Sequence, residues 1–568
     1  TWNDMARRVA RFQSALTKLS LTKADRVGIL LRNGIDWVAC DIAIMATGCV
    51  TVPLYTHDSP AGTVGIISHA QCRLVVLDDH ERWRSLQPLI EKSCGLEYVW
   101  VKEPSTNAAE TADPDVAVVS LDAALDTTLG DAADDLKDVA CNPDDMATLI
   151  YTSGTTAEPK GVMLSHKAIL WNAEAVTKFV SVMPSDVLLS LLPLAHAFER
   201  TLGYYLPMMA GSTVAFARSL ETLRDDFTFI RPTMFLGVPR LYERIHARVR
   251  KQADGNPVSR WLLDLTAAIG WRRHEADRDL ASPPGLLQRM LWPVLHWLVA
   301  RHVLKVFGGR LRLAVSGGAP LDENVGRFLC GLGLPLVEGY GLTEAAPVVT
   351  ATSLEDSMLG SVGRPLDGVD IKLGEHDELL IRTPSAMLGY WQGNEATAQM
   401  LTRDGWMRTG DIAEIRDGRV FIRGRLKELI VLSTGESIVP SSIEAVITRD
   451  PLFEQVCVIG DNRPCLTAVV VLNGQEWQRL ATHLDIDVSD PNHPLAASEF
   501  QTRLRERTQH LSKPSHVRGI HAELIPWTID DGLLTPTLKV RRRLIEQRYT
   551  KEISATYEQI QFRPYTEN

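Results

Sequence analysis

The chain has 568 residues, enough for about three to four domains of ~150 residues each. Hydrophobic residues make up 45% and charged residues 23%, the balance of a soluble globular protein, which excludes a disordered chain, a collagen and a small disulfide scaffold. The 60 Lys and Arg against 70 Asp and Glu give a net charge of −10, which argues against a general nucleic-acid binder because phosphate affinity needs a basic field.

Short apolar runs alternate with helical patterns along the N-terminal part. The spacing predicts helices over residues 2–19, 35–48 and 61–70 and strands over residues 26–31, 50–55 and 73–77. Further strands are expected at residues 213–217, 234–237 and 311–316. Strands that alternate with helices indicate βα units and a parallel sheet, so we expect a multi-domain α/β protein.

Two segments depart from this rhythm. Residues 104–145 are acidic and rich in alanine, which predicts a surface excursion. Residues 286–307 are apolar but contain Pro293 and three cations, Arg289, Arg301 and Lys305, so they do not form the ~18–20-residue apolar run of a membrane span. Either a core-packed helix pair or an amphipathic surface that touches membrane or lipid would fit this segment.

Beyond about residue 375 the pattern changes to short strands with Asp-Gly turns at residues 404–405 and 417–418, a strong hairpin signal. Strands are expected at residues 378–382 and 419–425. An α+β pattern follows, with a helix near residues 441–448 and strands at 456–459 and 466–472. We therefore place a domain boundary at residue 425, between parts spanning 1–424 and 425–568.

The cysteines and the start of the sequence bear on the cellular compartment in which the protein works. No two of the eight cysteines form a CxxC pair, and no Cys/His cluster has zinc-finger spacing, so we expect buried thiols in a reducing cytosol. The sequence opens without Met or an apolar signal segment, and we expect its natural start to lie upstream.

The segment IYTSGTTAEPKGVMLS, residues 150–165, predicts a polyphosphate site. A strand ends near Tyr151, and hydroxyl and glycine residues follow: Thr152, Ser153, Gly154, Thr155 and Thr156. Consecutive hydroxyls and free backbone amides suit an anion, and Lys160 adds a positive charge. The spacing is not that of a P-loop. A plain Ser/Thr-rich turn is the alternative.

A second motif, VEGYGLTE at residues 337–344, offers a face for a base and ligands for a cation. Tyr340 could stack on a base, and Thr343 with Glu344 supply the hard oxygens that Mg²⁺ prefers beside phosphates. Upstream, residues 316–320 (SGGAP) follow a strand and would let the backbone approach a nucleotide. A glycine-rich loop with one packed tyrosine is the alternative.

Two weaker signals lie nearer the C-terminus. Asp411, in WMRTGD, could accept both hydroxyls of a ribose, with Arg425 following in RGRLKE. Lys539, in LLTPTLKVRRR, could neutralise charge on a carboxylate and an α-phosphate. Alone, Asp411 could equally be a turn residue and Lys539 a solvated surface charge.

Taken together and in this order, the four motifs resemble those of the adenylate-forming (AMP-binding) superfamily, over essentially the whole chain. PLAHAFER (193–200), GESIVP (435–440) and LTPTLK (534–539) look like the long-chain fatty acyl-CoA synthetase branch. The resemblance implies a large N-terminal domain with two mixed sheets flanked by helices and a β-rich subdomain, and a small mobile α+β C-terminal domain.

The resemblance also assigns nucleotide-binding roles. By similarity, ATP is bound at its phosphates by Thr152, Ser153, Gly154, Thr155, Thr156 and Lys160, at adenine by Gly317, Gly318, Ala319 and Tyr340, and at the ribose by Asp411, Ile422 and Arg425. Thr343 and Glu344 serve the phosphates and Mg²⁺, and the implied metal ligands are Glu344 and Thr155.

Three further residues receive roles by similarity. Lys539 is the adenylation lysine, and His196 gates the acyl pocket, although a hydrogen-bonded core histidine would also fit. Lys427 is the hinge, a position where many relatives carry Asp.

The implied reaction converts a fatty acid and ATP to acyl-AMP and pyrophosphate, and then to a thioester with coenzyme A. Alternatives are an acyl-AMP ligase that passes the acyl group to a carrier protein, and an inactive homologue that binds acyl or nucleotide ligands. The expected partners are fatty acid, ATP and coenzyme A, without nucleic acid. We expect a monomer or homodimer in the cytoplasm, with peripheral contact at the inner face of the membrane.

Overall fold

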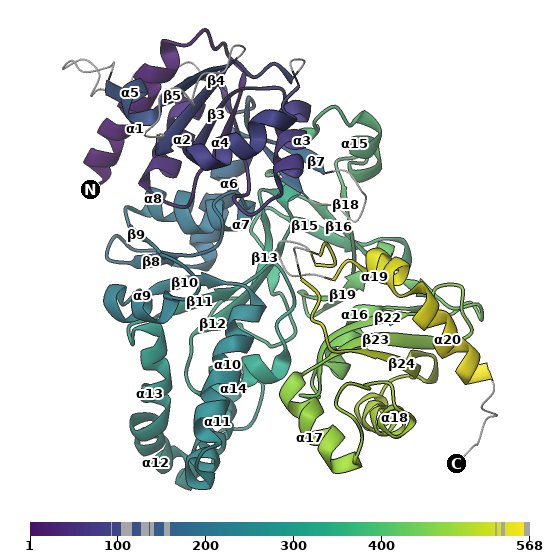
Figure 1. The fold of residues 1–568 in the computed structure, drawn as a ribbon. Coiled ribbons are helices and arrows are strands. Elements are labelled where there is room, and N and C mark those ends of the chain that lie inside the picture. The colour runs from purple at the N-terminus through teal and green to yellow at the C-terminus, as the bar shows by residue number, and fades with distance from the viewer. Residues whose placement is uncertain are drawn as a thin grey trace. The chain divides into compact units, whose positions relative to one another are not determined.

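The computed structural model describes residues 1–91, 94–103, 116–126, 136, 141–152, 159–528, 531–534 and 540–561. The chain divides into two compact units (Figure 1). Unit 1 comprises Thr1–Lys372, Leu380–Thr409 and Ile415–Phe421, and unit 2 comprises Leu373–Leu379, Gly410–Glu414 and Ile422–Asn568. The functional division at residue 425 stays a prediction.

An eight-stranded mixed sheet forms the first layer of unit 1. Strands β1 to β6 are mutually parallel, β7 pairs antiparallel with β6, and the edge strand β17 pairs antiparallel with β7. In sheet order the strands are β17 (Gly389–Tyr390), β7 (Lys160–Ser165), β6 (Met146–Thr152), β2 (Val50–Pro53), β1 (Arg26–Leu30), β3 (Cys72–Asp79), β4 (Tyr98–Glu103) and β5 (Ala117–Ser120). The predicted βα units are confirmed.

The helices associated with this sheet follow the predicted pattern. They are α1 (Trp2–Thr17), α2 (Ile35–Ala46), α3 (Pro60–Ala70), α4 (His80–Leu86), η1 (Gln87–Leu89), α5 (Leu121–Asp126) and α6 (His166–Phe179). Helix α2 ends before the predicted residue 48 because Gly48 adopts φ +77°, a left-handed conformation that stops a helix. Residues 104–145 are not only a surface excursion, since β5 joins the sheet and Leu121 and Leu125 are buried.

A seven-stranded mixed sheet forms the second layer. Strands β8 to β12 are parallel, β13 pairs antiparallel with β12, and β14 pairs antiparallel with β13. In sheet order the strands are β14 (Arg364–Pro365), β13 (Val348–Ala351), β12 (Leu336–Gly341), β11 (Leu313–Ser316), β10 (Met234–Gly237), β8 (Val187–Ser190) and β9 (Thr213–Phe216). The three strands expected at residues 213–217, 234–237 and 311–316 are therefore present as β9, β10 and β11.

Helices α10, α11 and α14 cover this sheet with one shared hydrophobic core. The helical segments of this part are α7 (Ala197–Arg200), η5 (Thr201–Tyr205), α8 (Leu206–Ala210), α9 (Leu223–Ile230), α10 (Pro239–Ala253), α11 (Pro257–Ala276), α12 (Leu286–Leu295), η6 (His296–Ala300), α13 (Arg301–Leu304), η7 (Lys305–Phe307), α14 (Glu323–Gly331) and η8 (Thr343–Ala345). Residues 286–307 are helical. Ala300 and Phe307 pack in this core, whereas one apolar face of α12 is exposed.

A four-stranded sheet has the order β15 (Asp370–Leu373), β16 (Glu378–Arg382), β18 (Met407–Arg416), β19 (Arg419–Arg425), with η9 (Glu375–Asp377) and α15 (Asn394–Met400) in the connections. Asp417 and Gly418 connect β18 to β19 with φ values of +50° and +74°. Two consecutive positive φ values are those of a type I′ turn, which fits the twist of a hairpin. The Asp-Gly signal at residues 417–418 therefore predicted the turn correctly.

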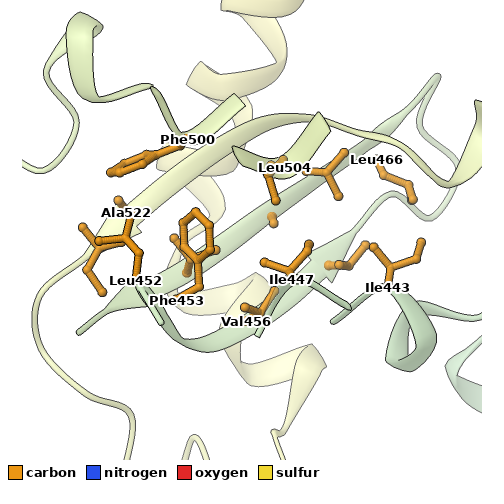
Figure 2. Packing of buried hydrophobic residues seen from close by; sticks show 14 of the residues in the cluster. Ile443, Ile447, Leu452, Phe453, Val456, Leu466, Phe500, Leu504 and Ala522 are labelled. Carbon is orange, nitrogen blue, oxygen red and sulfur yellow. The ribbon is translucent and has the colours of Figure 1, made fainter. Parts of the chain in front are cut away.

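Unit 2 is built on a three-stranded sheet of β22 (Phe453–Ile459), β23 (Leu466–Leu472) and β24 (Val517–Glu523). Alternate residues of β22 and β23 face two separate cores, so both strands read as continuous apolar runs. Figure 2 shows one core, where Phe453, Ile447, Phe500 and Leu504 meet. The other elements are η10 (Leu426–Glu428), β20 (Ile430–Val431), β21 (Ser437–Ile438), α16 (Pro440–Ile447), α17 (Gly474–Leu484), α18 (Pro494–Thr508), η11 (Lys513–Ser515), α19 (Arg542–Arg548) and α20 (Thr550–Gln561).

All eight cysteines are free thiols, and Cys141 and Cys465 are half-buried rather than buried as predicted. No helix within the described ranges is both long and apolar enough to cross a membrane.

Candidate active site

The hairpin of β6 and β7 presents the predicted phosphate segment. Thr152 ends β6 and pairs with Lys160, the first residue of β7, so these two residues lie opposite each other. Ser153, Gly154, Thr155 and Thr156, which the sequence predicts as phosphate ligands, lie outside the described residues. The described part of the candidate anion site is thus the pair of strand ends that carry Thr152 and Lys160.

Tyr390 connects Lys160 to Glu344, two residues that the sequence places in separate motifs. The Lys160 Nζ lies 5.0 Å from the centroid of the Tyr390 ring, within cation–π range. The Tyr390 hydroxyl donates a hydrogen bond of 2.7 Å to Glu344 Oε1. Burial and the neighbouring carboxylate raise the pKa of Tyr390, so its phenol stays protonated and remains a donor. One tyrosine thereby contacts a cation with its ring and a carboxylate with its hydroxyl.

Backbone pairing and buried polar contacts hold this arrangement in place. Strand β17 pairs with β7, Tyr390 opposite Val162, which sets the ring beside the start of β7. On the Glu344 side, Met387 N donates to Glu344 O at 2.8 Å. The buried Asn172 amide donates to Val348 O at 2.7 Å and accepts from Val348 N at 3.1 Å. These contacts fix the turn that carries Glu344. Sequence reasoning missed Tyr390, because a single tyrosine outside a motif gives no signal.

The glycine-rich loop after β11 meets the PLAHAFER segment. A Cβ on the buried Gly317 would lie 2.8 Å from the Phe198 ring, so a larger residue there would have to displace that ring. Gly317 N donates to Gly237 O at 3.2 Å. Gly318, at φ +81°, and Ala319 are exposed. The carboxyl ends of β10 and β11 are therefore adjacent to the start of α7, at the edge where parallel sheets bind ligands.

His196 is the N-cap residue directly before α7 and does not lie in the core. It is half-buried, and its Nδ1 accepts a hydrogen bond from Phe198 N at 3.2 Å, which caps the helix. An accepting Nδ1 leaves the proton of the neutral ring on Nε2. The contact between Phe198 and Gly317 places this segment next to the glycine-rich loop.

Arg200, from the same segment, anchors α7 through a buried ion pair with Asp41. Arg200 also donates to Thr148 Oγ1 at 2.7 Å, and the Tyr205 hydroxyl donates to Asp41 Oδ2 at 2.9 Å. The side chains of Arg200 and Asp41 are at most 1% exposed. The sequence motif contains Arg200, but only the fold reveals its partner, 159 residues away in α2.

Tyr340 and Thr343 lie at the end of the second sheet. Tyr340 is half-buried on β12 opposite Thr350, and Thr343 begins η8 directly before Glu344. Glu338, two residues before Tyr340 on β12, is buried, which raises its pKa to about 8. Tyr340 thus lies at the end of β12, and Thr343 and Glu344 lie in η8, which follows it.

The predicted ribose ligands belong to unit 2. Arg425 Nε lies 3.1 Å from Asp411 Oδ1, and the Asp411 side chain is 7% exposed against 51% for Arg425. Ile422 lies three residues before Arg425 on β19 and is half-buried. Lys427 is exposed in η10, immediately after β19. Asp411 and Arg425 therefore form an ion pair, whereas the sequence showed only that Arg425 follows Asp411 in the chain.

Lys539 lies outside the described residues. Of the residues on either side, Leu534 and Val540 pair as an antiparallel bridge, and Leu533 and Leu534 are buried in one core of unit 2.

The donor set fits a magnesium ion bound mainly through a nucleotide. Among the residues that the structure describes, no three His, Cys, Asp or Glu side chains gather as a metal cluster. Mg²⁺ in phosphate sites needs only one or two carboxylates, with phosphate and water oxygens completing its shell. Glu344 is such a carboxylate, oriented by Tyr390.

The chain belongs to the AMP-binding enzyme family. The family matches residues 1–391, and the AMP-binding enzyme C-terminal domain matches residues 427–561. The predicted superfamily, fold class and enzyme type are thereby confirmed.

Several curated proteins are similar over nearly the whole chain. The long-chain-fatty-acid–CoA ligase FadD15 of Mycobacterium bovis is 29% identical, over 98% of this chain and 92% of its own. Long-chain-fatty-acid–CoA ligase 5 of Rattus norvegicus is 30% identical over 94% of this chain and 80% of its own. A chloroplastic long-chain-fatty-acid–[acyl-carrier-protein] ligase of Arabidopsis thaliana, AEE15, is 29% identical over 98% and 82%.

Solved structures share the fold. ATP-bound MatB from Rhodopseudomonas palustris superposes with a TM-score of 0.71 at 21% identity, covering 96% of this chain and 92% of its own. The adenylation domain of a carboxylate reductase from Mycobacterium chelonae gives 0.73 at 23% identity, with 98% and 84% covered.

Proposed function

We propose that the protein activates a long-chain fatty acid with ATP to acyl-AMP and pyrophosphate, and then transfers the acyl group to coenzyme A. The observation that carries the proposal is the Lys160–Tyr390–Glu344 arrangement, which sets a cation and a metal-binding carboxylate beside the phosphate hairpin. The names of similar curated proteins support the fatty acid and the thiol acceptor.

The chemistry requires no side-chain nucleophile. The carboxylate of the fatty acid attacks the α-phosphorus of ATP and pyrophosphate leaves, after which the thiolate of coenzyme A displaces AMP. Positioning and charge neutralisation supply the catalysis. Lys160 and the hydroxyls that begin at Thr152 would hold the phosphates, Glu344 and Thr155 would hold Mg²⁺, and Mg²⁺ when bound would neutralise phosphate charge.

The remaining residues would bind the nucleoside and the acyl group. Tyr340 would stack on adenine beside the loop of Gly317 to Ala319, and the Asp411–Arg425 pair, near Ile422, would bind the ribose. His196 and the end of β10 would border the acyl channel. Aromatic packing around Gly237, where an added Cβ would lie 2.9 Å from the Tyr242 ring, would limit the depth of the channel.

A chain-length series with ATP, Mg²⁺ and coenzyme A tests this function. We expect acyl-CoA formation to rise with chain length, because each buried CH₂ contributes about 0.8 kcal/mol. A preference for medium-chain, branched or aryl acids would contradict the proposed substrate class.

A carrier protein is the second candidate acceptor, favoured by the similarity to the Arabidopsis acyl-carrier-protein ligase. Accumulation of acyl-AMP in the presence of coenzyme A, released only by a carrier protein, would select this alternative. An absence of fatty-acid-dependent ATP–pyrophosphate exchange would instead indicate an inactive homologue.

Tyr390→Phe is expected to raise the Mg²⁺ concentration for half-maximal ATP–pyrophosphate exchange by about 10–100-fold. The substitution removes the hydroxyl that orients Glu344, and loss of such a partner weakens a metal site by this amount. The phenylalanine side chain would keep an aromatic ring beneath Lys160, so the cation–π contact serves as an internal control. An unchanged Mg²⁺ dependence would exclude Glu344 as a metal ligand positioned by Tyr390.

Lys427→Pro tests the proposed hinge. Proline fixes φ near −65° and is expected to restrict rotation of the C-terminal domain. We expect pyrophosphate release to stay within about twofold of wild type while thioester formation slows by about tenfold or more, because the two half-reactions would use two domain orientations. Lys427→Ala is the matched control, expected to leave both steps unchanged. Equal losses in both steps of Lys427→Pro would contradict a hinge role.

A further inference from the structure

Helix α12 and the following η6 expose a continuous apolar surface, here called the docking face. Leu286, Leu287 and Met290 are 70–77% exposed, and Trp297 is 61% exposed. The complete docking face consists of Leu286, Leu287, Met290, Leu291, Val294, Trp297 and Leu298. These positions recur at helical spacing, so they share one side of the helix.

The opposite side of the same helices packs against the protein, so the docking face stays exposed to solvent. The half-buried Trp292 contacts Gly270 of α11 and lies 5.2 Å from the guanidinium of Arg273. Leu295 and Ala300 are buried. Figure 1 shows α12 at the end of the helical layer remote from the second sheet. The apolar surface is thus a fixed feature of the helical layer.

The charge around the docking face is strongly positive. Residues 280–321 contain no Asp or Glu but five Arg and Lys, among them the exposed Arg289, Arg301 and Lys305. Residues 239–321 carry 14 Arg and Lys against six Asp and Glu, a net charge of +8, whereas the whole chain has −10. Cationic side chains that border exposed Leu, Met and Trp are the pattern of helices that lie in the interface of an anionic bilayer.

The same charge disfavours a second copy of the chain on this surface. Pairing of the docking face with itself across a twofold axis would bring Arg289, Arg301 and Lys305 of both copies together. Like charges that meet at an interface oppose binding. Anionic headgroups instead complement the border, and acyl chains match the apolar centre.

We propose that the docking face binds the surface of an anionic phospholipid bilayer, with the side chains of Leu287, Met290 and Trp297 inserted below the headgroups. Arg289, Arg301 and Lys305 then contact lipid phosphates. This binding needs no nucleotide or fatty acid, so it can be measured independently of the ligase activity.

Flotation of the full chain with vesicles tests the proposal. We expect binding to phosphatidylcholine vesicles that contain phosphatidylglycerol and much weaker binding to phosphatidylcholine alone. Raising the salt from about 0.1 M to about 1 M should weaken binding, because the Debye length falls from about 10 to about 3 Å.

The triple variant Leu287→Gln, Met290→Gln, Trp297→Gln should lose about tenfold or more in vesicle partitioning, since the strength of such binding increases with the apolar area inserted. The control variant Ile35→Gln, Leu495→Gln, Ile525→Gln replaces three side chains of 52–68% exposure on other parts of the chain and should bind as wild type. Trp292 is unsuitable for replacement, because it packs on Gly270. Circular dichroism of both variants checks that they fold.

Three results would overturn the proposal. Wild-type protein that does not float with anionic vesicles would do so, as would a triple variant that binds like wild type. A self-associating wild type that the triple substitution makes monomeric, with no vesicle binding by either, would assign the docking face to contact between copies.

Discussion

Lys539→Ala is expected to reduce acyl-AMP formation from fatty acid and ATP by about 10²–10³-fold. Removal of one group that stabilises developing charge in a transition state typically costs this factor. The variant should still convert supplied acyl-AMP and coenzyme A to the thioester, because the second half-reaction does not form the acyl-phosphate bond. Pyrophosphate release and thioester formation, measured separately, check both parts.

Two variants serve as controls for Lys539. Lys551→Ala removes an exposed lysine of α20 and should leave both half-reactions unchanged. Lys539→Arg keeps the charge but replaces a compact ammonium with a planar guanidinium, so partial activity is expected. Overall activity of Lys539→Ala near the wild-type level would refute the role of this lysine.

Asp41→Ala is expected to lower the free energy of unfolding of unit 1 by about 3–5 kcal/mol. The substitution leaves the guanidinium of Arg200 buried without its carboxylate partner, which is far more costly than loss of a surface pair. The Tyr205 hydroxyl also loses its acceptor. Urea unfolding followed by tryptophan fluorescence measures the change.

An exposed ion pair provides the contrast. Asp370→Ala breaks the pair with Arg382, whose two side chains are both more than half exposed, and should cost less than about 1 kcal/mol. Replacement of both buried partners, as Asp41→Leu with Arg200→Met, should be milder than Asp41→Ala because no charge is left unpaired. An Asp41→Ala variant as stable as Asp370→Ala would show that the buried pair is not the anchor of α7.

The local elements could be predicted closely from the sequence because local physics dominates them. The continuous apolar runs of β22 and β23 and the Asp417–Gly418 turn needed only side-chain pattern and backbone preference. Predicted element ends were wrong at places such as Gly48. The short, weakly apolar strand β5 was missed, because it forms by pairing with β4.

The candidate site was predictable only where its residues form contiguous motifs. Lys160 and Glu344 were singled out in this way, but Tyr390, which links them, gave no signal, since its role arises from pairing β17 with β7. The partner of Arg200 was equally hidden. Likewise, residues 286–307 allowed two interpretations, and only the packing of Trp292 on α11 decided which face of α12 is exposed.

The family, the order of the motifs and most helices and strands could be inferred from the amino-acid sequence, because they depend on residues close together in the chain. The fold was needed to show which motifs meet, as Lys160 meets Glu344 through Tyr390, and which apolar surfaces stay uncovered. Hydrogen bonds, burial and charge pairing act between residues that are neighbours in space, and the sequence around one partner does not identify the other.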